Sequence, residues 1–109
     1  MSDLTQEMKQ FGRERGADLI GVAPAERFRD FPPERSPMSV FPEAQAVVVV
    51  GRRITRGSLR GTEEGTNLNL YGQFGLSWLN MQFLSLPTFE LTEWLEDRGW
   101  EAVPLFPFP

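Results

Sequence analysis

The first residues of the chain alternate apolar and polar positions with the period of an amphipathic helix. Leu4, Met8 and Phe11 recur at i, i+4 and i+7, which places them on one face of a helix. Gly16 is suited to end that helix, and the apolar segment 18–23, with two β-branched residues, predicts a strand. A helix, a glycine turn and a strand in this order predict the opening of an α/β fold.

A proline-rich connection and a second strand follow. Residues 24–42 contain five prolines, a density that breaks regular structure, and their apolar side chains predict a structured loop more than a free linker. The segment 44–50 ends in four consecutive valines and shows no polar alternation. We expect it to form a strand that is buried on both faces, as in the interior of a helix-covered sheet.

Residues 70–99 carry apolar side chains at helical spacing through most of their length. Pro87 interrupts the pattern, so either one helix kinks there or a second helix starts near Ser85 and holds Pro87 in its first turn. Gly99 is suited to end this helical region. The apolar segment 100–105 predicts a further strand.

Three glycines spaced four residues apart occupy the polar segment 57–67. The spacing is that of a membrane dimerisation motif, but that motif requires an apolar helix and this segment is polar. We expect a mobile surface loop here.

The composition restricts the chemistry of the chain. Its 109 residues are enough for one domain, so we expect residues 1–109 to form a single α/β module. A net charge of -4 argues against a nucleic-acid binder. The absence of cysteine and histidine excludes disulfides, thiolate nucleophiles, cysteine-ligated clusters and the most common general base. We predict no metal site.

The sequence also predicts the cellular compartment. The first 22 residues lack the basic and apolar regions of a secretory signal. No run approaches the roughly 18 apolar residues of a membrane span. We therefore expect a cytoplasmic protein that does not enter a membrane.

The strongest candidate for binding chemistry is a cluster of arginines after the valine strand. Open α/β sheets bind ligands outside the carboxyl ends of their strands, and the arginine fork pairs well with phosphate or carboxylate. A flavin, nucleotide or corrinoid phosphate, or an acidic partner surface, would fit. The alternative is that Arg52 and Arg53 are simply the first exposed residues after a core strand and pair with Glu63 and Glu64. The cluster comprises Arg52, Arg53, Arg56 and Arg60.

Tyr71 is the only tyrosine and opens the long helical region. At this position its hydroxyl can hydrogen-bond a cofactor. Anions are also favoured at a helix N-terminus. The alternative is a core side chain with a satisfied hydroxyl. The chain contains neither a P-loop nor a dinucleotide-binding glycine fingerprint, so a nucleotide would have to be held in another way.

Three stretches of the sequence resemble a known family. Taken in order, FGRERGADLIGVAPAERF, VFPEAQAVVVVGRRITRG and YGQFGLSWLNMQFLSLPTFELTEWLEDRGWEAVPL resemble the N-terminal part of the epoxyqueuosine reductase-like iron–sulfur proteins, which are related to corrinoid-dependent reductive dehalogenases. The resemblance implies a partial nitroreductase-like or cobalamin-reductase-like α/β domain, with a small sheet and flanking helices. The family's iron–sulfur cysteines and its proposed proton donor have no matching position in this chain.

The resemblance implies a function that the chain performs with others. We expect a subunit or N-terminal module of an epoxyqueuosine reductase-like redox enzyme, not catalytic alone, which scaffolds and contacts a cobalamin or flavin shared with a partner chain that carries iron–sulfur clusters. A homo-oligomer or a larger partner chain would complete the core. The cofactor contacts would come from Arg52, Arg53, Arg56 and Tyr71.

Two other functions remain open at the level of sequence. The first is a non-catalytic assembly or regulatory protein that oligomerises without a cofactor. The second is a small flavin-binding protein in which the arginines hold the flavin phosphate. Whether the chain belongs to an enzyme is therefore undecided by the residues themselves.

Overall fold

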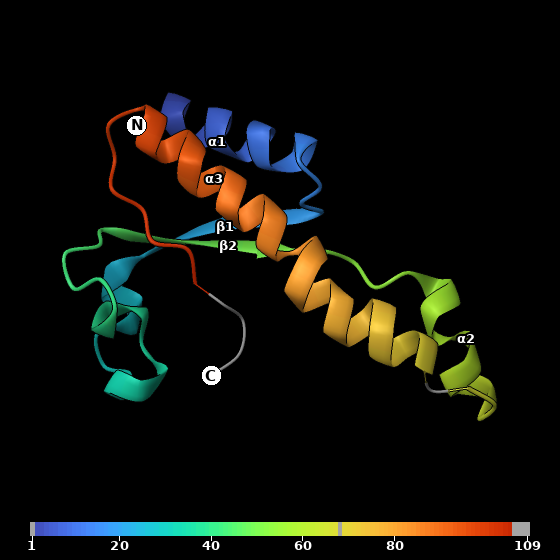
Figure 1. Ribbon diagram of the computed structural model, residues 1–109. Coiled ribbons are helices and arrows are strands. Elements are labelled where there is room, and N and C mark those ends of the chain that lie inside the picture. Colours follow the sequence, from blue (N-terminus) through green and yellow to red (C-terminus); the bar gives the residue numbers. More distant parts are fainter. Residues whose placement is uncertain (1, 68, 106–109) are drawn as a thin grey trace.

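The computed structural model describes residues 2–67 and 69–105. Two helices cover one face of a small antiparallel sheet, and a long helical rod continues from this core to a separate short helix (Figure 1). The prediction of an α/β fold with a small sheet and flanking helices is confirmed. The helices are α1 (Ser2–Glu14), α2 (Arg56–Glu64) and α3 (Ser85–Asp97), and the strands are β1 (Leu19–Pro24) and β2 (Ala46–Gly51).

The opening of the chain folds as its pattern predicts. α1 presents Met8 to the interior, where this side chain is buried. The helix ends before Gly16, whose φ of 112° is a conformation that other residues rarely adopt. β1 then starts at Leu19. The predicted helix and the predicted first strand are both confirmed.

The sheet consists of β1 and β2 in an antiparallel register that runs from Leu19 opposite Gly51 to Pro24 opposite Ala46. Directly opposed residues share a face, so Ile20 and Val50 point together toward the helices. There they pack against a buried cluster that joins the sheet to both helices. That cluster comprises Met8, Leu91 and Trp94, with Leu4, Phe11, Ile20, Val48, Val50 and Leu95 packed around it.

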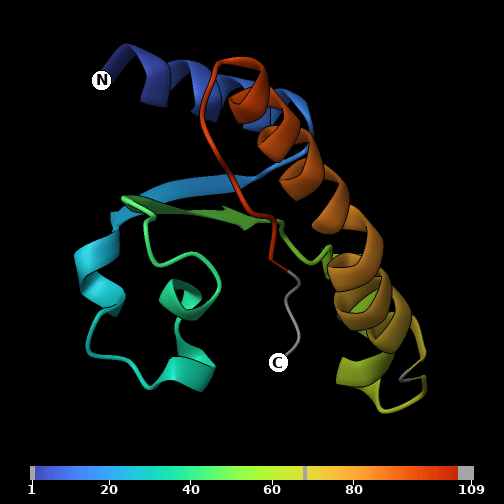
Figure 2. The ribbon, with the colours of Figure 1, turned by 60° about the vertical axis from the view of Figure 1, so that its left-hand side comes forward.

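The other face of the sheet corrects the expectation of a strand buried on both sides. Val49 is 56% exposed and Leu19 is 74% exposed, although both are large and apolar. The reason is that the described residues form only two strands and that α1 and α3 pack on one face (Figures 1 and 2). The strand 46–51 itself is confirmed, but the described residues leave much of its second face exposed.

The connection between the strands is irregular but held in place, as predicted. Three short 3₁₀ turns follow one another along it, at Ala25–Phe28, Pro33–Arg35 and Pro37–Ser39. The Ser36 hydroxyl donates to the Phe28 carbonyl at 3.2 Å and accepts from the Met38 amide at 3.1 Å. These bonds satisfy backbone groups where the prolines prevent a regular ladder.

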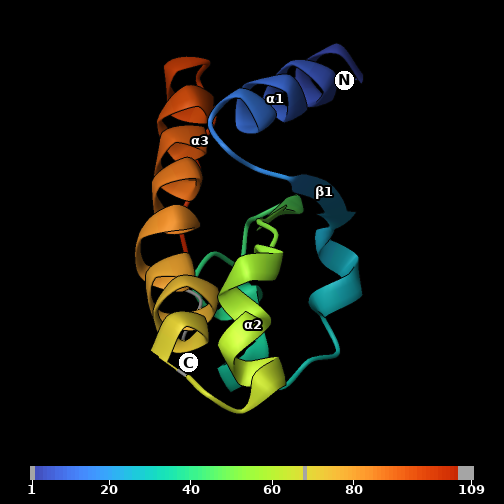
Figure 3. The same ribbon diagram turned by 90° about the vertical axis from the view of Figure 1, so that its right-hand side faces the viewer.

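The prediction of a mobile loop over residues 57–67 is wrong, because α2 occupies most of it. Gly65, with φ of 74°, ends this helix and donates its amide to the Thr62 carbonyl. α2 packs against the helical segment Tyr71–Ser77 (Figure 3), and Gly61 lies directly against Asn67. Of the three glycines only Gly61 is needed for close packing, because a Cβ atom at Gly57 or Gly65 would meet nothing within 4 Å.

The long helical rod starts with two π-helical segments, Tyr71–Ser77 and Leu79–Phe83, and continues as α3. α3 begins at Ser85 and holds the fully buried Pro87 in its first turn. Of the two alternatives for this region, the second helix that starts near Ser85 is therefore confirmed.

The C-terminal end of the rod confirms one prediction and corrects another. α3 ends at Asp97, and the Gly99 amide donates to the Glu96 carbonyl at 3.0 Å. The predicted strand 100–105 is wrong, because this segment has no regular secondary structure. It has no strand partner in the described sheet, and Pro104 removes a donor that a ladder would need.

Candidate functional site

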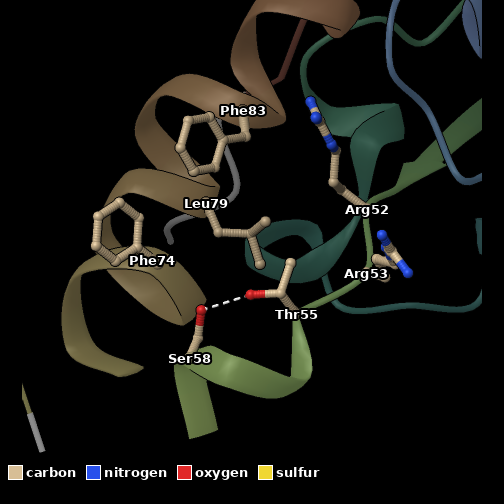
Figure 4. Close-up of a pocket in the computed structure, with 7 residues that line it drawn as sticks. All are labelled: Arg52, Arg53, Thr55, Ser58, Phe74, Leu79 and Phe83. Carbon is tan, nitrogen blue, oxygen red and sulfur yellow. Dashed lines mark hydrogen bonds between the residues drawn. The ribbon is translucent and has the colours of Figure 1, made fainter. Parts of the chain in front are cut away.

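A pocket of about 180 Å³ lies where β2 leads into α2. One wall is formed by the Arg52–Thr55 segment and the first turn of α2, and the opposite wall by the helical rod (Figure 4). Ligand binding outside the carboxyl ends of the strands is typical of open parallel sheets. That rule does not apply here, because β1 and β2 are antiparallel. The pocket results instead from the packing of the rod and α2 beside the end of β2. Its lining residues are Arg52, Arg53, Thr55, Ser58, Phe74, Leu79 and Phe83.

The backbone of the arginine wall is fixed by Asp18. The carboxylate of Asp18 accepts a hydrogen bond from the Arg53 amide at 2.7 Å, and the Asp18 amide donates to the Gly51 carbonyl at 2.9 Å. Hydrogen bonds to a charged acceptor are stronger than neutral ones. The chain therefore leaves β2 in one defined direction, which determines where Arg52 and Arg53 lie.

The Arg52 guanidinium is positioned by packing. It lies 5.7 Å from the centroid of the Phe83 ring, within the range of a cation–π contact. It also passes over Gly16, where a Cβ atom would come within 2.9 Å of the Arg52 Nη1 atom. Gly16 therefore has two roles. It adopts the backbone conformation that ends α1, and its lack of a side chain leaves room for Arg52.

The ion pairs of the arginine cluster differ from the sequence-based alternative. Arg56 pairs with Glu63 at 2.7 Å and Arg60 with Glu64 at 3.1 Å. Within the part of the chain that the structure describes, Arg52 and Arg53 form no such pair with a carboxylate. The prediction that Glu63 and Glu64 neutralise Arg52 and Arg53 is wrong, because the four paired residues all lie on α2.

Two hydroxyl groups close the pocket at the start of α2. The Thr55 and Ser58 oxygens lie 2.7 Å apart, within hydrogen-bonding distance, and Ser58 is buried. Thr55 is the N-cap residue of α2. The pocket is thus polar at this end and at the arginines, and apolar along the rod.

The apolar wall determines what size of group the pocket can accept. Phe74, Leu79 and Phe83 line the pocket from the rod, and of the three the Leu79 side chain projects furthest toward the Arg52–Thr55 segment (Figure 4). Pockets for drug-sized ligands have volumes of about 300–1,000 Å³, well above the 180 Å³ measured here. A flavin or corrinoid therefore fits only in part, and the rest of the group would have to be held outside this pocket.

The four predicted contact residues do not lie together. Arg52 and Arg53 line the pocket, whereas Arg56 and Tyr71 do not. The Arg56 guanidinium pairs with Glu63 on the exposed side of α2. The Tyr71 ring packs over Gly75, where a Cβ atom would come within 2.6 Å of the ring. Tyr71 therefore packs within its own helical segment.

The remaining lining residues were not singled out by the sequence. Thr55 and Ser58 show the spacing of an N-cap, a usable signal, but a loop was expected there. Phe74, Leu79 and Phe83 fit the pattern of ordinary core residues. Their role in the pocket depends on how α2 and the rod pack, which no local pattern encodes.

Within residues 2–67 and 69–105, no group of three or more acidic side chains is arranged to hold a metal ion. No helix in these ranges is both long and apolar enough to cross a membrane.

Comparisons of the chain with protein-family models, with curated proteins and with solved structures found no match. The resemblance to the epoxyqueuosine reductase-like proteins therefore stays a prediction that rests on the three stretches of sequence. The function has to be argued from the surface and the pocket described above.

Proposed function

We propose that this chain is a subunit or N-terminal module of an epoxyqueuosine reductase-like redox enzyme in the cytoplasm. It supplies scaffold and the arginine wall of a site whose cofactor, a cobalamin or a flavin, is held mainly by a partner chain with iron–sulfur clusters. When bound, that cofactor would supply the redox chemistry. Arg52 and Arg53 would bind its anionic part.

The observation that carries the proposal is an unfinished hydrophobic core. Among the described residues, six hydrophobic residues are buried, and two of these are alanines, whereas sixteen large hydrophobic residues are exposed. Single exposed apolar residues are normal, but extensive apolar surface indicates a binding partner. A partner that covers this surface would give the chain the core that it lacks.

Many of the exposed residues lie in two places. One is the open face of the sheet, which carries Leu19 and Val49. The other is the part of the rod before the core, where Phe74, Trp78 and Met81 are exposed. A strand composed almost entirely of valine is typical of a sheet covered on both faces. Both places therefore fit a chain that folds against another polypeptide.

The pocket supports the cofactor contact in chemistry and in size. Arg52 has no carboxylate partner among the described residues and faces an apolar wall. Its fork suits a phosphate or carboxylate. The small volume agrees with a shared site, because only part of a flavin or corrinoid fits there.

A non-catalytic assembly protein is the second candidate. Residues 65–89 contain no charged residue, so the same segment of a second copy would meet it without charge repulsion. This candidate predicts a homo-oligomer that contains no cofactor. Both candidate functions explain the exposed apolar surface. They differ in the complex that they predict, which is a homo-oligomer here and a complex with a different, larger chain in the first proposal.

Native mass spectrometry and a visible absorption spectrum separate the candidates. Both are recorded on the chain purified under non-denaturing conditions from the cells that produce it. The proposal predicts a larger partner chain together with the absorption bands of iron–sulfur, corrinoid or flavin groups. A colourless homo-oligomer would favour the assembly protein. A compact monomer that unfolds cooperatively and binds no apolar dye would contradict both.

A matched pair of variants tests whether the open sheet face is the contact. Leu19→Arg places a charge on the exposed apolar face and should abolish capture of the partner. Gln6→Arg introduces the same side chain on an exposed position of α1 and should leave capture unchanged. Equal capture by both variants would exclude the sheet face from the interface.

A further inference from the structure

The pocket beside β2 combines a cation with aromatic rings. The sequence pattern of the arginines or of the phenylalanines does not by itself predict that the two lie together. The Arg52 guanidinium lies over the Phe83 ring at 5.7 Å. Phe74 belongs to the same wall, and Leu79 lies between them along the rod (Figure 4). A group that binds here meets a positive charge at one end and ring surfaces along its side.

The volume limits the apolar part of such a group to one ring. An engineered apolar cavity of about 150 Å³ in another protein accepts benzene, and this pocket measures about 180 Å³. Two fused rings with a charged group attached would exceed that space. The pocket therefore suits a single aromatic ring with one small substituent.

The charge of the substituent follows from the polar residues. Arg52 and Arg53 have no carboxylate partner in the described ranges, and the pocket contains no acidic residue. The Thr55 and Ser58 hydroxyls share one hydrogen bond, so one of the two can still donate to a bound oxygen. Every polar group of the lining is thus either cationic or a neutral hydroxyl, which favours an anion.

We propose that this pocket binds a single-ring aromatic anion, an aryl phosphate or carboxylate, with its oxygens on Arg52 and its ring against Phe83 and Leu79. This proposal rests on the proposed function in one respect only, namely that the aromatic anion is part of a larger cofactor or substrate. As a binding site it stands on the residues of this chain alone.

Titration of the full chain with three probes tests the ligand class. Phenyl phosphate has both features, phenol lacks the charge, and inorganic phosphate lacks the ring. We expect phenyl phosphate to bind at least about tenfold more tightly than either of the other two, since each part adds a contact. NMR signals of Ser58 and Phe83 should shift with it. Equal affinity of phenyl phosphate and inorganic phosphate would overturn the proposal.

Two arginine variants locate the charge contact. Arg52→Gln should weaken phenyl phosphate at least about tenfold. Arg56→Gln removes an equal charge from an arginine that pairs with Glu63 outside the pocket and should change the affinity less than about twofold. Equal losses in the two variants would mean an adventitious charge effect and would overturn the site.

Further variants protect the test against misfolding. Phe83→Leu keeps an apolar side chain and should weaken phenyl phosphate while leaving inorganic phosphate unchanged. If Arg52→Gln does not fold, Arg52→Lys keeps the charge without the fork and should still weaken phenyl phosphate; unchanged binding would overturn the proposal. The titration needs no partner chain. A negative result would therefore overturn the binding site without bearing on the proposed partner, and the absence of a partner would not bear on the binding site.

Discussion

The two ends of the helical rod differ in environment although they are continuous. In the C-terminal half of α3, Leu91 is 4% exposed and Trp94 is 8% exposed, and both pack in the core. Just before them, Leu86 is 59% exposed and Phe89 is 53% exposed. We call residues 69–89 the uncharged arm and residues 90–97 the core end.

The difference lies in charge more than in hydrophobicity. The core end carries acidic residues on its outer side, such as Glu93 and Glu96, which are exposed. The uncharged arm has no charged residue at all and exposes apolar side chains such as Leu76, Trp78 and Met81. Large apolar side chains in a helix without any charged residue are typical of a covered environment. The arm therefore has the composition of a buried helix in an exposed place.

The largest effect should come from truncation at the core end. Leu91→Ala removes a buried side chain between α1 and the sheet, and we expect a loss of about 2–5 kcal/mol in the free energy of unfolding. Phe89→Ala, two residues away and exposed, should cost less than about 0.5 kcal/mol in the chain alone. Urea unfolding of both variants measures the contrast. Similar losses would mean that the arm is buried in the free chain.

A smaller effect is expected inside the arm. Gly75→Ala places a Cβ atom within 2.6 Å of the Tyr71 ring, so we expect a destabilisation of about 1–3 kcal/mol that is confined to the arm. Gly72→Ala is the matched control, because nothing lies within 4 Å of its Cβ position, and it should stabilise by up to about 1 kcal/mol. Hydrogen exchange of residues 71–83 reports both changes. The same sign for both would refute the packing of Tyr71 on Gly75.

Exchange of a single exposed side chain should change the surface of the arm and leave stability unaffected. Leu86→Gln removes exposed apolar area, so binding of an apolar dye should fall while the free energy of unfolding changes by less than about 0.5 kcal/mol. Gln82→Leu makes the opposite change at an exposed position of the same arm and should raise dye binding. Unchanged dye binding in both variants would show that the arm is covered.

The smallest effect belongs to the ion pair on α2. Arg56 and Glu63 are both largely exposed, so their coupling should be about 0.2–1 kcal/mol and should decrease with added salt. A double-mutant cycle with Arg56→Gln and Glu63→Gln measures it. A coupling that is independent of salt would indicate that this pair is shielded from solvent.

Local pattern was sufficient to predict the elements of the core. The period of Leu4, Met8 and Phe11 predicted α1, and the valine run predicted β2. The start of α3 near Ser85 followed from the position of Pro87. These features depend on residues that are close in sequence, so the sequence displays them directly.

The failed predictions depend on distant contacts. α2 was expected to be a loop because its glycines disfavour an isolated helix, yet packing against the segment Tyr71–Ser77 and burial of Ser58 stabilise it. The segment 100–105 has strand composition but no strand beside it. For the site, the arginines were visible at the end of β2, whereas the aromatic wall emerges only when the arm and α2 pack together.

We propose that the uncharged arm is an interface that another polypeptide covers. Hydrogen exchange of the chain alone and of the complex captured from cells tests it most directly. The account predicts that, in the chain alone, amides of residues 71–83 exchange at least about tenfold faster than those of residues 91–95, and that the complex removes this difference. Equal protection of the two segments in a free monomer would contradict it.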